Sequence, residues 1–208
     1  MGGLIVAIPC RDTVAFRFFE SMISLRVPDG THWTGVSGTL SYVTRNELAR
    51  AVLEGGYDRV LWLQGDVAFS PDLAERLAAD LDAGLEYVSA LCFTQGGGQV
   101  LPDAYSEVGW QDDGAGGKVL CATRFEEYPR DSLFRVAGTS LSAVMMSADA
   151  IRRVGEAFGA PFDPVPSTAD ESLSFCARLT ELGIAMYCDS RVALGRVGGE
   201  LIGDRPYE

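Results

Sequence analysis

Short apolar runs alternate with helical patterns along the first half of the chain, and this alternation constrains the fold more than any other feature. Residues 4–9 (LIVAIP) are a continuous apolar run, and residues 59–63 (RVLWL) are apolar after the initial Arg, which is typical of strands covered on both faces. Residues 14–25, 44–54 and 70–83 show helical spacing between turn signals. We therefore predict a three-layer α/β fold with a mostly parallel central sheet and one antiparallel strand.

The remainder of the chain continues this pattern with one interruption. Further strands are predicted over 31–38 and 86–93, and further helices over 148–158 and 169–182. Residues 94–117 are rich in Gln, Gly and Asp, which predicts a surface insertion that is loop-rich or contains a hairpin. The helix after the third strand is predicted to begin at Ser70, with this residue as its N-cap. A length of 208 residues favours a single domain over 1–208.

Composition excludes several classes of protein. A hydrophobic content of 47% with 22% charged residues is that of a globular domain rather than a disordered chain. No apolar run has the length of a membrane span, and the first residues lack the pattern of a secretory leader. The five Cys residues are scattered and form no C-x-x-C pair, and His32 is the only histidine. We therefore expect a cytoplasmic protein with reduced thiols and no structural zinc site.

The net charge of −12 argues against non-specific binding to nucleic acid, which depends on neutralising phosphates. A small phosphorylated ligand remains compatible with this charge. Such a ligand would need local positive charge from a divalent cation, an arginine or a helix N-terminus.

Two polar segments follow predicted strands, at the edge where open α/β sheets bind their ligands. They are residues 9–12 (PCRD) and 64–66 (QGD). Asp66 after a buried strand is a hard oxygen ligand suited to Mg²⁺ or Mn²⁺ on a diphosphate. An Asp in this position can equally belong to an ordinary turn or cap the following helix. The residues themselves leave both interpretations open.

Three further groups have the residue types of a binding site, and each has an ordinary structural explanation. Arg45 with Asn46, near a helix start, could hold a phosphate, or could belong to a solvated helix face. Asp170 and Glu171 could act as a general base, or could simply favour the N-terminus of a helix. Arg196 lies between glycines that permit close approach of a ligand, or a tight turn.

Taken in order, several segments resemble the small GT-A fold glycosyltransferases of tailed phages and bacteria. The segments are IVAIPCRDTV, TRNELARAVLEGGYDRVLWLQGDVAFSPDL, VSALCF, VAGTSLSAVMMSADAI and DESLSFCARLTELGIAMYCDSRVALGRVG. Together they extend from Ile5 to Gly198. The resemblance implies one nucleotide-sugar-binding domain with the GT-A fold.

The resemblance also implies roles for individual residues. The donor-binding side would consist of Pro9, Cys10, Asp12, Arg45, Asn46, Gln64, Gly65, Asp66 and Arg196. The acceptor side would contain Gly138, Thr139 and Ser172, with Asp170 or Glu171 as the base of an inverting transfer. Asp66 matches the last acid of the family's Asp-x-Asp motif, so it would be the metal-facing carboxylate.

Three residues depart from the family pattern. Gln64 stands where the first acid of the Asp-x-Asp motif is expected, and Ser172 stands where the acidic pair before the late helix usually ends in Asp. Arg196 stands where the family has a His that can complete the metal site. Gln offers a neutral carbonyl, and Arg has no lone pair for a cation, so divalent binding should be weak or absent.

The substitution of Arg for His places a fixed positive charge where a metal would act. At an effective dielectric constant of about 20, an Arg roughly 4 Å from a phosphate oxygen gains about 4 kcal/mol before desolvation. This favours a transferase whose leaving diphosphate is held without a metal. Two alternatives stay open: weak dependence on Mg²⁺ or Mn²⁺ through Asp66, and a binding protein in which Arg196 pairs with Asp66.

We therefore expect a glycosyltransferase that uses a nucleotide sugar, such as a UDP-sugar, and requires either no cofactor or a weakly bound Mg²⁺ or Mn²⁺. The alternative is a non-catalytic protein that binds a nucleotide sugar or a glycan. The acceptor could be a virion protein, a glycan or a modified nucleobase. Nucleic acid enters only as the last of these, and the net charge makes it the least attractive.

Overall fold

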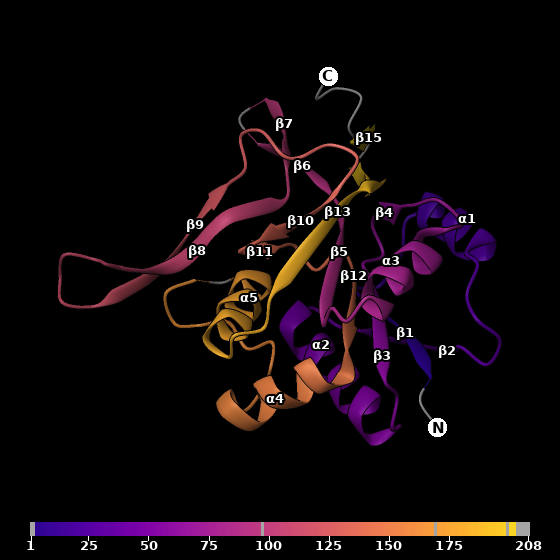
Figure 1. The fold of residues 1–208 in the computed structure, drawn as a ribbon, viewed down its shortest axis with the longest axis horizontal. Helices are drawn as coiled ribbons and strands as arrows, with labels where there is room; N and C mark the ends of the chain where they lie inside the picture. The colour runs from indigo at the N-terminus through magenta and orange to yellow at the C-terminus, as the bar shows by residue number, and fades with distance from the viewer. Residues whose placement is uncertain (1–2, 97, 169, 199, 203–208) are drawn as a thin grey trace.

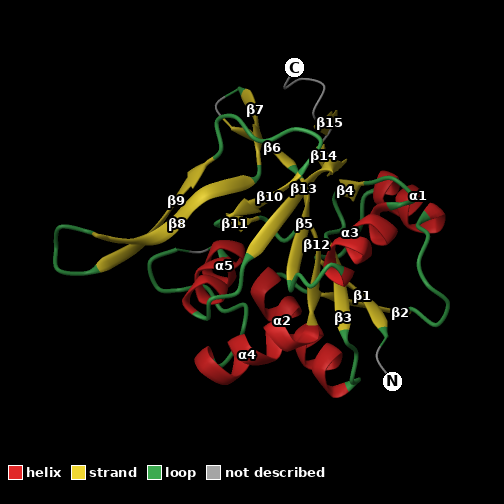
Figure 2. Cartoon of the chain, viewed as in Figure 1, coloured by secondary structure: helices red, strands yellow, loops and turns green. Residues whose placement is uncertain are grey.

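A mixed α/β fold surrounds a central sheet of seven strands (Figures 1 and 2). The computed structural model describes residues 3–96, 98–168, 170–198 and 200–202. Five of the seven strands run in one direction, which confirms the predicted α/β class with a mostly parallel sheet. In spatial order the strands are β10 (Leu133–Val136), β13 (Met186–Ala193), β5 (Tyr87–Leu91), β12 (Ala143–Ser147), β3 (Arg59–Leu63), β1 (Leu4–Cys10) and β2 (His32–Ser37).

Helices cover both faces of this sheet (Figure 2). They are α1 (Phe16–Ser24), α2 (Ser41–Glu54), α3 (Leu73–Asp82), α4 (Ala148–Phe158) and α5 (Glu171–Glu181). Alternate residues of β3 enter different cores: Leu61 packs with Phe18 of α1 and Leu77 of α3, whereas Trp62 packs with Leu48 of α2 and other residues of the opposite face. Burial on both faces explains why the sequence of this strand is a continuous apolar run.

Two strands oppose the main direction, where one was predicted. β12 runs antiparallel to both β3 and β5 in the middle of the sheet, and β10 runs antiparallel to β13 at its edge. Their sequences are short and apolar like those of the parallel strands, so strand direction was not visible in the pattern. Connectivity decides it: the chain enters β12 from β11, which pairs with the hairpin strand β8, so β12 starts beside the carboxyl end of β3 and runs back along it.

Residues 93–124 form two antiparallel hairpins. β6 (Phe93–Gly96) pairs with β7 (Gln99–Pro102), and β8 (Ala104–Asp112) pairs with β9 (Lys118–Arg124). The long β8–β9 hairpin projects from the body of the molecule (Figure 1). β8 also pairs with the short strand β11 (Gly138–Thr139), which connects the hairpin to the sheet through β12.

The start of α3 differs from the prediction. Ser70 does not cap this helix; Asp72 occupies the N-cap position, without a capping hydrogen bond from its side chain. The Asp72 carboxylate instead accepts a 2.6 Å hydrogen bond from Arg76 Nε, one turn along the helix. The short strand β4 (Val67–Ala68) precedes this turn, and β14 (Gly195–Gly198) pairs with β4 on one side and β15 (Glu200–Ile202) on the other. Asp66 therefore lies in the connection between β3 and β4 and does not cap α3.

In the described part of the chain, no helix has the length and hydropathy needed to cross a bilayer.

The two-sided burial of β3 leads to a test of the fold. Leu61→Ala and Trp62→Ala should each lower the free energy of unfolding by several kcal/mol, roughly 2–5 for Leu and 3–5 for Trp. The two neighbours face different cores, and both are fully buried. Urea denaturation followed by circular dichroism would measure both. If one of the two substitutions proved nearly neutral, the strand would be covered on only one face.

Candidate functional site

Two adjoining cavities open at the edge where β1 and β3 end. Cavity 1, of about 560 Å³, lies against the loop between β1 and α1 and the start of α2. Cavity 2, of about 600 Å³, lies against the two hairpins and the start of α5. Gln64, Arg45 and Glu171 line both cavities and so form the boundary between them.

The end of β3 supplies the floor of this boundary. The Gln64 amide N–H donates to the carbonyl of Ser142 at 2.8 Å, which continues the pairing of β3 with β12. The Gln64 side chain accepts a 3.4 Å hydrogen bond from Ser142 Oγ. At Gly65 a Cβ would lie 2.8 Å from Val14 Cγ1, so any other residue would push away the wall of cavity 1. The Gly65 carbonyl accepts a 2.8 Å bond from the Ala15 N–H, which fixes that wall.

Arg45 is a buried cation with incomplete hydrogen bonding. Only 2% of the residue is exposed, and burial lowers the pKa of its guanidinium below the ordinary value while Glu171 opposes that shift. Nη2 donates to the Leu141 carbonyl at 3.2 Å, and Nε lies 3.6 Å from Glu171 Oε1. Nη1 and Nε have no hydrogen-bond partner among the described residues. Each unpaired buried donor costs about 1–3 kcal/mol, so Arg45 is held at this boundary at a cost to stability.

Arg196 reaches the same region from the C-terminal part of the chain. β14 pairs with β4 so that Arg196 lies opposite Val67, and the Val197 N–H donates to the Asp66 carbonyl at 2.7 Å. Arg196 Nη2 donates to Ser142 Oγ at 2.6 Å, and its Nε is buried without a hydrogen-bond partner in the described chain. Two carboxylates flank the guanidinium: Asp66 Oδ2 lies 4.0 Å from Nε, and Asp103 Oδ2 lies 3.7 Å from Nη2.

Asp103 was not among the sequence-predicted residues. It is buried, and its Oδ1 accepts hydrogen bonds from Arg124 Nη1 at 2.9 Å and from Tyr105 Oη at 3.3 Å. Its carboxylate thus connects two arginines that line cavity 2, Arg124 and Arg196. The available signal was an acid between apolar residues (VLPDAY), the same signal that singled out Asp66.

The residues present do not fit a divalent cation beside Asp66. An oxygen-liganded metal needs several carboxylates or carbonyls, and a guanidinium has no lone pair to offer. Here the position next to the Asp66 carboxylate is held by Arg196, and Gln64 Oε1 accepts a hydrogen bond from Ser142. In the described residues, no group of three or more His, Cys, Asp or Glu side chains has the arrangement of a metal site.

Asp170 caps α5 and also lines cavity 2. Its Oδ1 accepts bonds from the N–H groups of Ser172 and Leu173 at 2.9 and 3.0 Å. Burial raises the pKa of the Asp170 carboxyl above its ordinary value, although these two N–H groups act in the opposite direction. Oδ2 has no hydrogen bond among the described residues, so one oxygen is fixed and the other can accept a proton.

The other sequence-predicted residues divide between the cavities and positions outside them. Pro9, Cys10, Gly65 and Asp66 line cavity 1, and Thr139 and Ser172 line cavity 2. Asp12 is exposed and lies outside both linings, and Gly138 is buried against Cys176.

Asn46 also lies outside the cavities, because its side chain holds another segment. Its Nδ2 donates to Asp163 Oδ1 at 2.8 Å, and its Oδ1 accepts from the Phe162 N–H at 2.9 Å. Both ends of the amide are therefore used to attach the segment between α4 and α5.

The cysteines are all free. Burial raises the pKa of Cys92 to about 11 and those of Cys176 and Cys188 to about 12, so these thiols remain protonated at neutral pH. Cys10, in the wall of cavity 1, donates weakly to the Val36 carbonyl at 3.8 Å. None of these contacts activates a thiol as a nucleophile.

Comparison with known proteins identifies the fold but not the activity. No family profile and no curated protein matches the sequence. Among solved structures, A197 from STIV superimposes with a TM-score of 0.65 at 13% identity, over 94% of this chain and 86% of that one. At this identity the likeness establishes a shared fold alone.

The two roles of Asp170 can be separated by a matched pair of substitutions. Asp170→Ala removes the cap of α5 and should lower the free energy of unfolding by about 1 kcal/mol, whereas Asn is as good a cap as Asp. A carboxyl with a raised pKa in the folded state disfavours folding once it ionises. The stability of Asp170→Asn relative to the wild type should therefore increase as the pH rises above the ordinary Asp pKa of about 4. Urea denaturation of both variants and the wild type from acid to neutral pH would measure this. A relative stability that instead decreases with pH would mean that the N–H bonds outweigh burial.

Proposed function

We propose that the protein has a GT-A type donor site and transfers a sugar from a nucleotide sugar to an acceptor hydroxyl. The observation that carries the proposal is a pair of arginines in the cavity lining: Arg45 lines both cavities, and Arg196 lines cavity 2. A diphosphate beside these guanidinium groups would gain charge-assisted hydrogen bonds. The nucleoside would occupy cavity 1, and the sugar and acceptor would occupy cavity 2.

The chemistry then follows from the side chains at the boundary. The acceptor oxygen forms a bond to the anomeric carbon while the bond from that carbon to the diphosphate breaks. The bonding electrons leave with the diphosphate, whose negative charge Arg45 and Arg196 stabilise in place of a metal. Asp170 accepts the acceptor's proton through the oxygen that is not bound to the helix N-terminus. Glu171 orients Arg45 through its 3.6 Å ion pair.

A second function has one observation in its favour. The charge of Arg196 is already balanced by Asp66 and Asp103, so this arginine could serve the structure of the site rather than a leaving group. A protein that binds a nucleotide sugar or a glycan without transferring the sugar would need no more than this. Binding without turnover is the behaviour that separates it from the transferase.

Binding of the donor should not require a metal. Isothermal titration with UDP- and GDP-sugars should give the same affinity with and without EDTA, because arginines supply the positive charge. Loss of binding in EDTA would overturn the metal-free site. Absence of binding by every nucleotide sugar tested would overturn the transferase and the nucleotide-sugar-binding protein, and would leave only the glycan-binding protein.

Substitution of Arg196 should lower the affinity for the donor more than the stability of the fold. Arg196→Ala should weaken donor binding by roughly 10- to 100-fold, the range expected for a lost hydrogen bond to a charged group. Arg50→Ala is the matched control, since Arg50 is an exposed arginine on α2 outside both cavities. If Arg196→Ala lowered the urea midpoint but left affinity unchanged, the arginine would be structural.

Substitution of the proposed base, Asp170, should separate donor binding from sugar transfer. Asp170→Asn keeps the cap of α5 and should retain donor binding, but it should abolish sugar transfer measured by release of the nucleoside diphosphate. Retained turnover in this variant would exclude Asp170 as the base.

A further inference from the structure

Helix α1 is apolar on two opposite faces, although the rest of the chain covers only one of them. On the inner face Phe18 is buried and Met22 is partly buried, and the Phe18 ring packs edge-on against Phe69 with centroids 5.9 Å apart. On the outer face Phe16, Phe19 and Ile23 are 73%, 50% and 71% exposed.

These three outer residues form one continuous surface, which we call the α1 patch. Phe16 and Phe19 lie one turn apart with ring centroids 6.3 Å from each other, and Ile23 lies one turn beyond Phe19. Isolated exposed apolar side chains are common on proteins, but a contiguous group that includes two aromatic rings is typical of an interaction surface.

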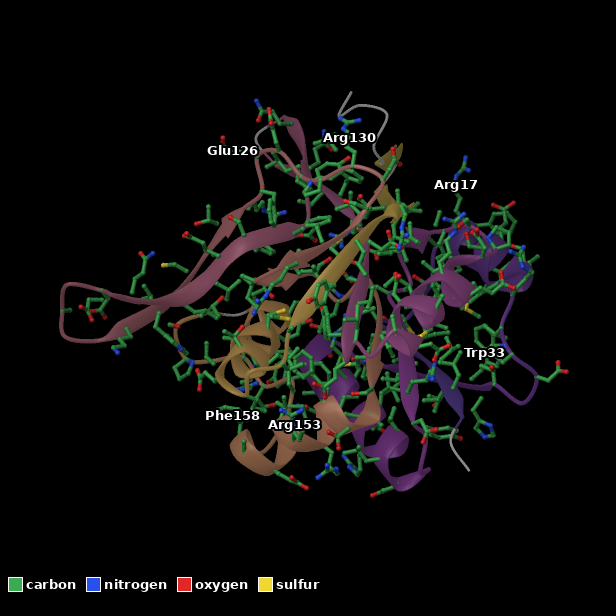
Figure 3. All side chains as sticks on the ribbon, in the orientation of Figure 1. Arg17, Trp33, Glu126, Arg130, Arg153 and Phe158 are labelled. Atoms are coloured by element: carbon green, nitrogen blue, oxygen red, sulfur yellow. The ribbon has the colours of Figure 1, made fainter. Side chains whose placement is uncertain are left out.

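Two opposite charges flank the α1 patch. Arg17 and Glu20 are both exposed, and at 100° per residue they lie on the same side of the helix. Neither has an ion-pair partner within the described part of the chain. Figure 3 labels Arg17, whose side chain points away from the body of the molecule.

We propose that the α1 patch binds the α1 patch of a second copy of this chain, with the two helices antiparallel about a two-fold axis. In such an interface the same surface meets itself, so residue i contacts residue j and residue j contacts residue i. Antiparallel pairing brings the same flank of each helix together. Arg17 of each copy then faces Glu20 of the other, while the rings of Phe16 and Phe19 pack between the helices.

The charges favour a second copy over a lipid surface. A helix that lies on a membrane usually carries an excess of Lys and Arg on its polar face. Here Arg17 is balanced by Glu20, so the helix carries no excess of positive charge toward an anionic leaflet.

The size of the patch sets the expected strength of association. A helix of nine residues is about 14 Å long, so the pair buries less area than a standard protein interface. We therefore expect a dimer that dissociates on dilution, with a dissociation constant in the micromolar range or weaker. The inference does not depend on the proposed function.

Sedimentation equilibrium of the full chain from ~1 µM to ~1 mM would test the proposal. The wild type should change from monomer to dimer across this range. Phe19→Asp should weaken association by at least about 30-fold, as expected for a central aromatic contact. Phe158→Asp is the matched control, because Phe158 is a partly exposed aromatic residue on α4, and it should leave association unchanged.

Charge exchange tests the antiparallel geometry. Arg17→Glu and Glu20→Arg should each weaken the dimer by roughly tenfold, because each creates two like-charge contacts across the axis. The double variant R17E/E20R restores opposite charges in both contacts and should recover wild-type association. These residues are exposed, so urea midpoints should stay close to that of the wild type and show that the fold is intact.

Three outcomes would overturn the proposal. The first is a wild type that stays monomeric at every concentration. The second is a dimer that Phe19→Asp does not weaken. The third is a double variant no better than the single ones, which would exclude the antiparallel pairing. A parallel arm measures sedimentation with phosphatidylcholine vesicles and with vesicles containing phosphatidylserine. Vesicle binding that is lost in Phe19→Asp, together with a monomer in solution, would assign the α1 patch to lipid.

Discussion

Strand β3 is hydrogen-bonded along both edges and covered by side chains on both faces. The position of the candidate site at the end of this strand depends on that arrangement. β1 lies parallel on one edge and β12 antiparallel on the other, so the backbone polar groups of the strand are paired within the sheet. Because the side chains on both faces of the strand are also buried, its polar side chains lie at its ends. Gln64 and Asp66 lie just after the carboxyl end of β3. The hydrogen bond from the Gln64 N–H to the Ser142 carbonyl extends the pairing of β3 with β12 to a residue that lines both cavities.

The second constraint is electrostatic. Arg45 and Arg196 are brought from distant parts of the chain to the lining of the cavities, where Arg45 is buried and Arg196 is partly buried. Glu171, Asp66 and Asp103 limit the cost of this burial, yet buried N–H groups of both arginines stay unpaired. A site of this kind is suited to a multiply charged oxygen ligand, since it holds positive charge in place before the ligand arrives. The same carboxylates that stabilise the two arginines also reduce the net positive charge available to a ligand.

Local patterns predicted the strands well because burial on both faces leaves a strong sequence signal. They were weaker at element ends. α2 begins at Ser41 rather than at residue 44, and α3 begins at Leu73 rather than at Ser70, with Asp72 at its N-cap position. Asn46 shows why a polar residue near a site can be misassigned. Its amide could contact a ligand or fasten a neighbouring segment, and only the position of Phe162 and Asp163 distinguishes the two.

The sequence by itself determined the α/β class, the approximate positions of the helices and of the strands of the central sheet, and the polar segment after β3, because each follows from interactions between residues close in the chain. Tertiary structure decided the direction of β12, the placement of Asp103 between Arg124 and Arg196, and the two cavities that share Arg45 and Glu171. These features join segments far apart in sequence, and no local pattern records which distant charges will face each other. The pairing of β4 with β14 brings two of these distant segments together. It places the Arg196 guanidinium beside the Asp66 carboxylate, which follows β3 in the sequence.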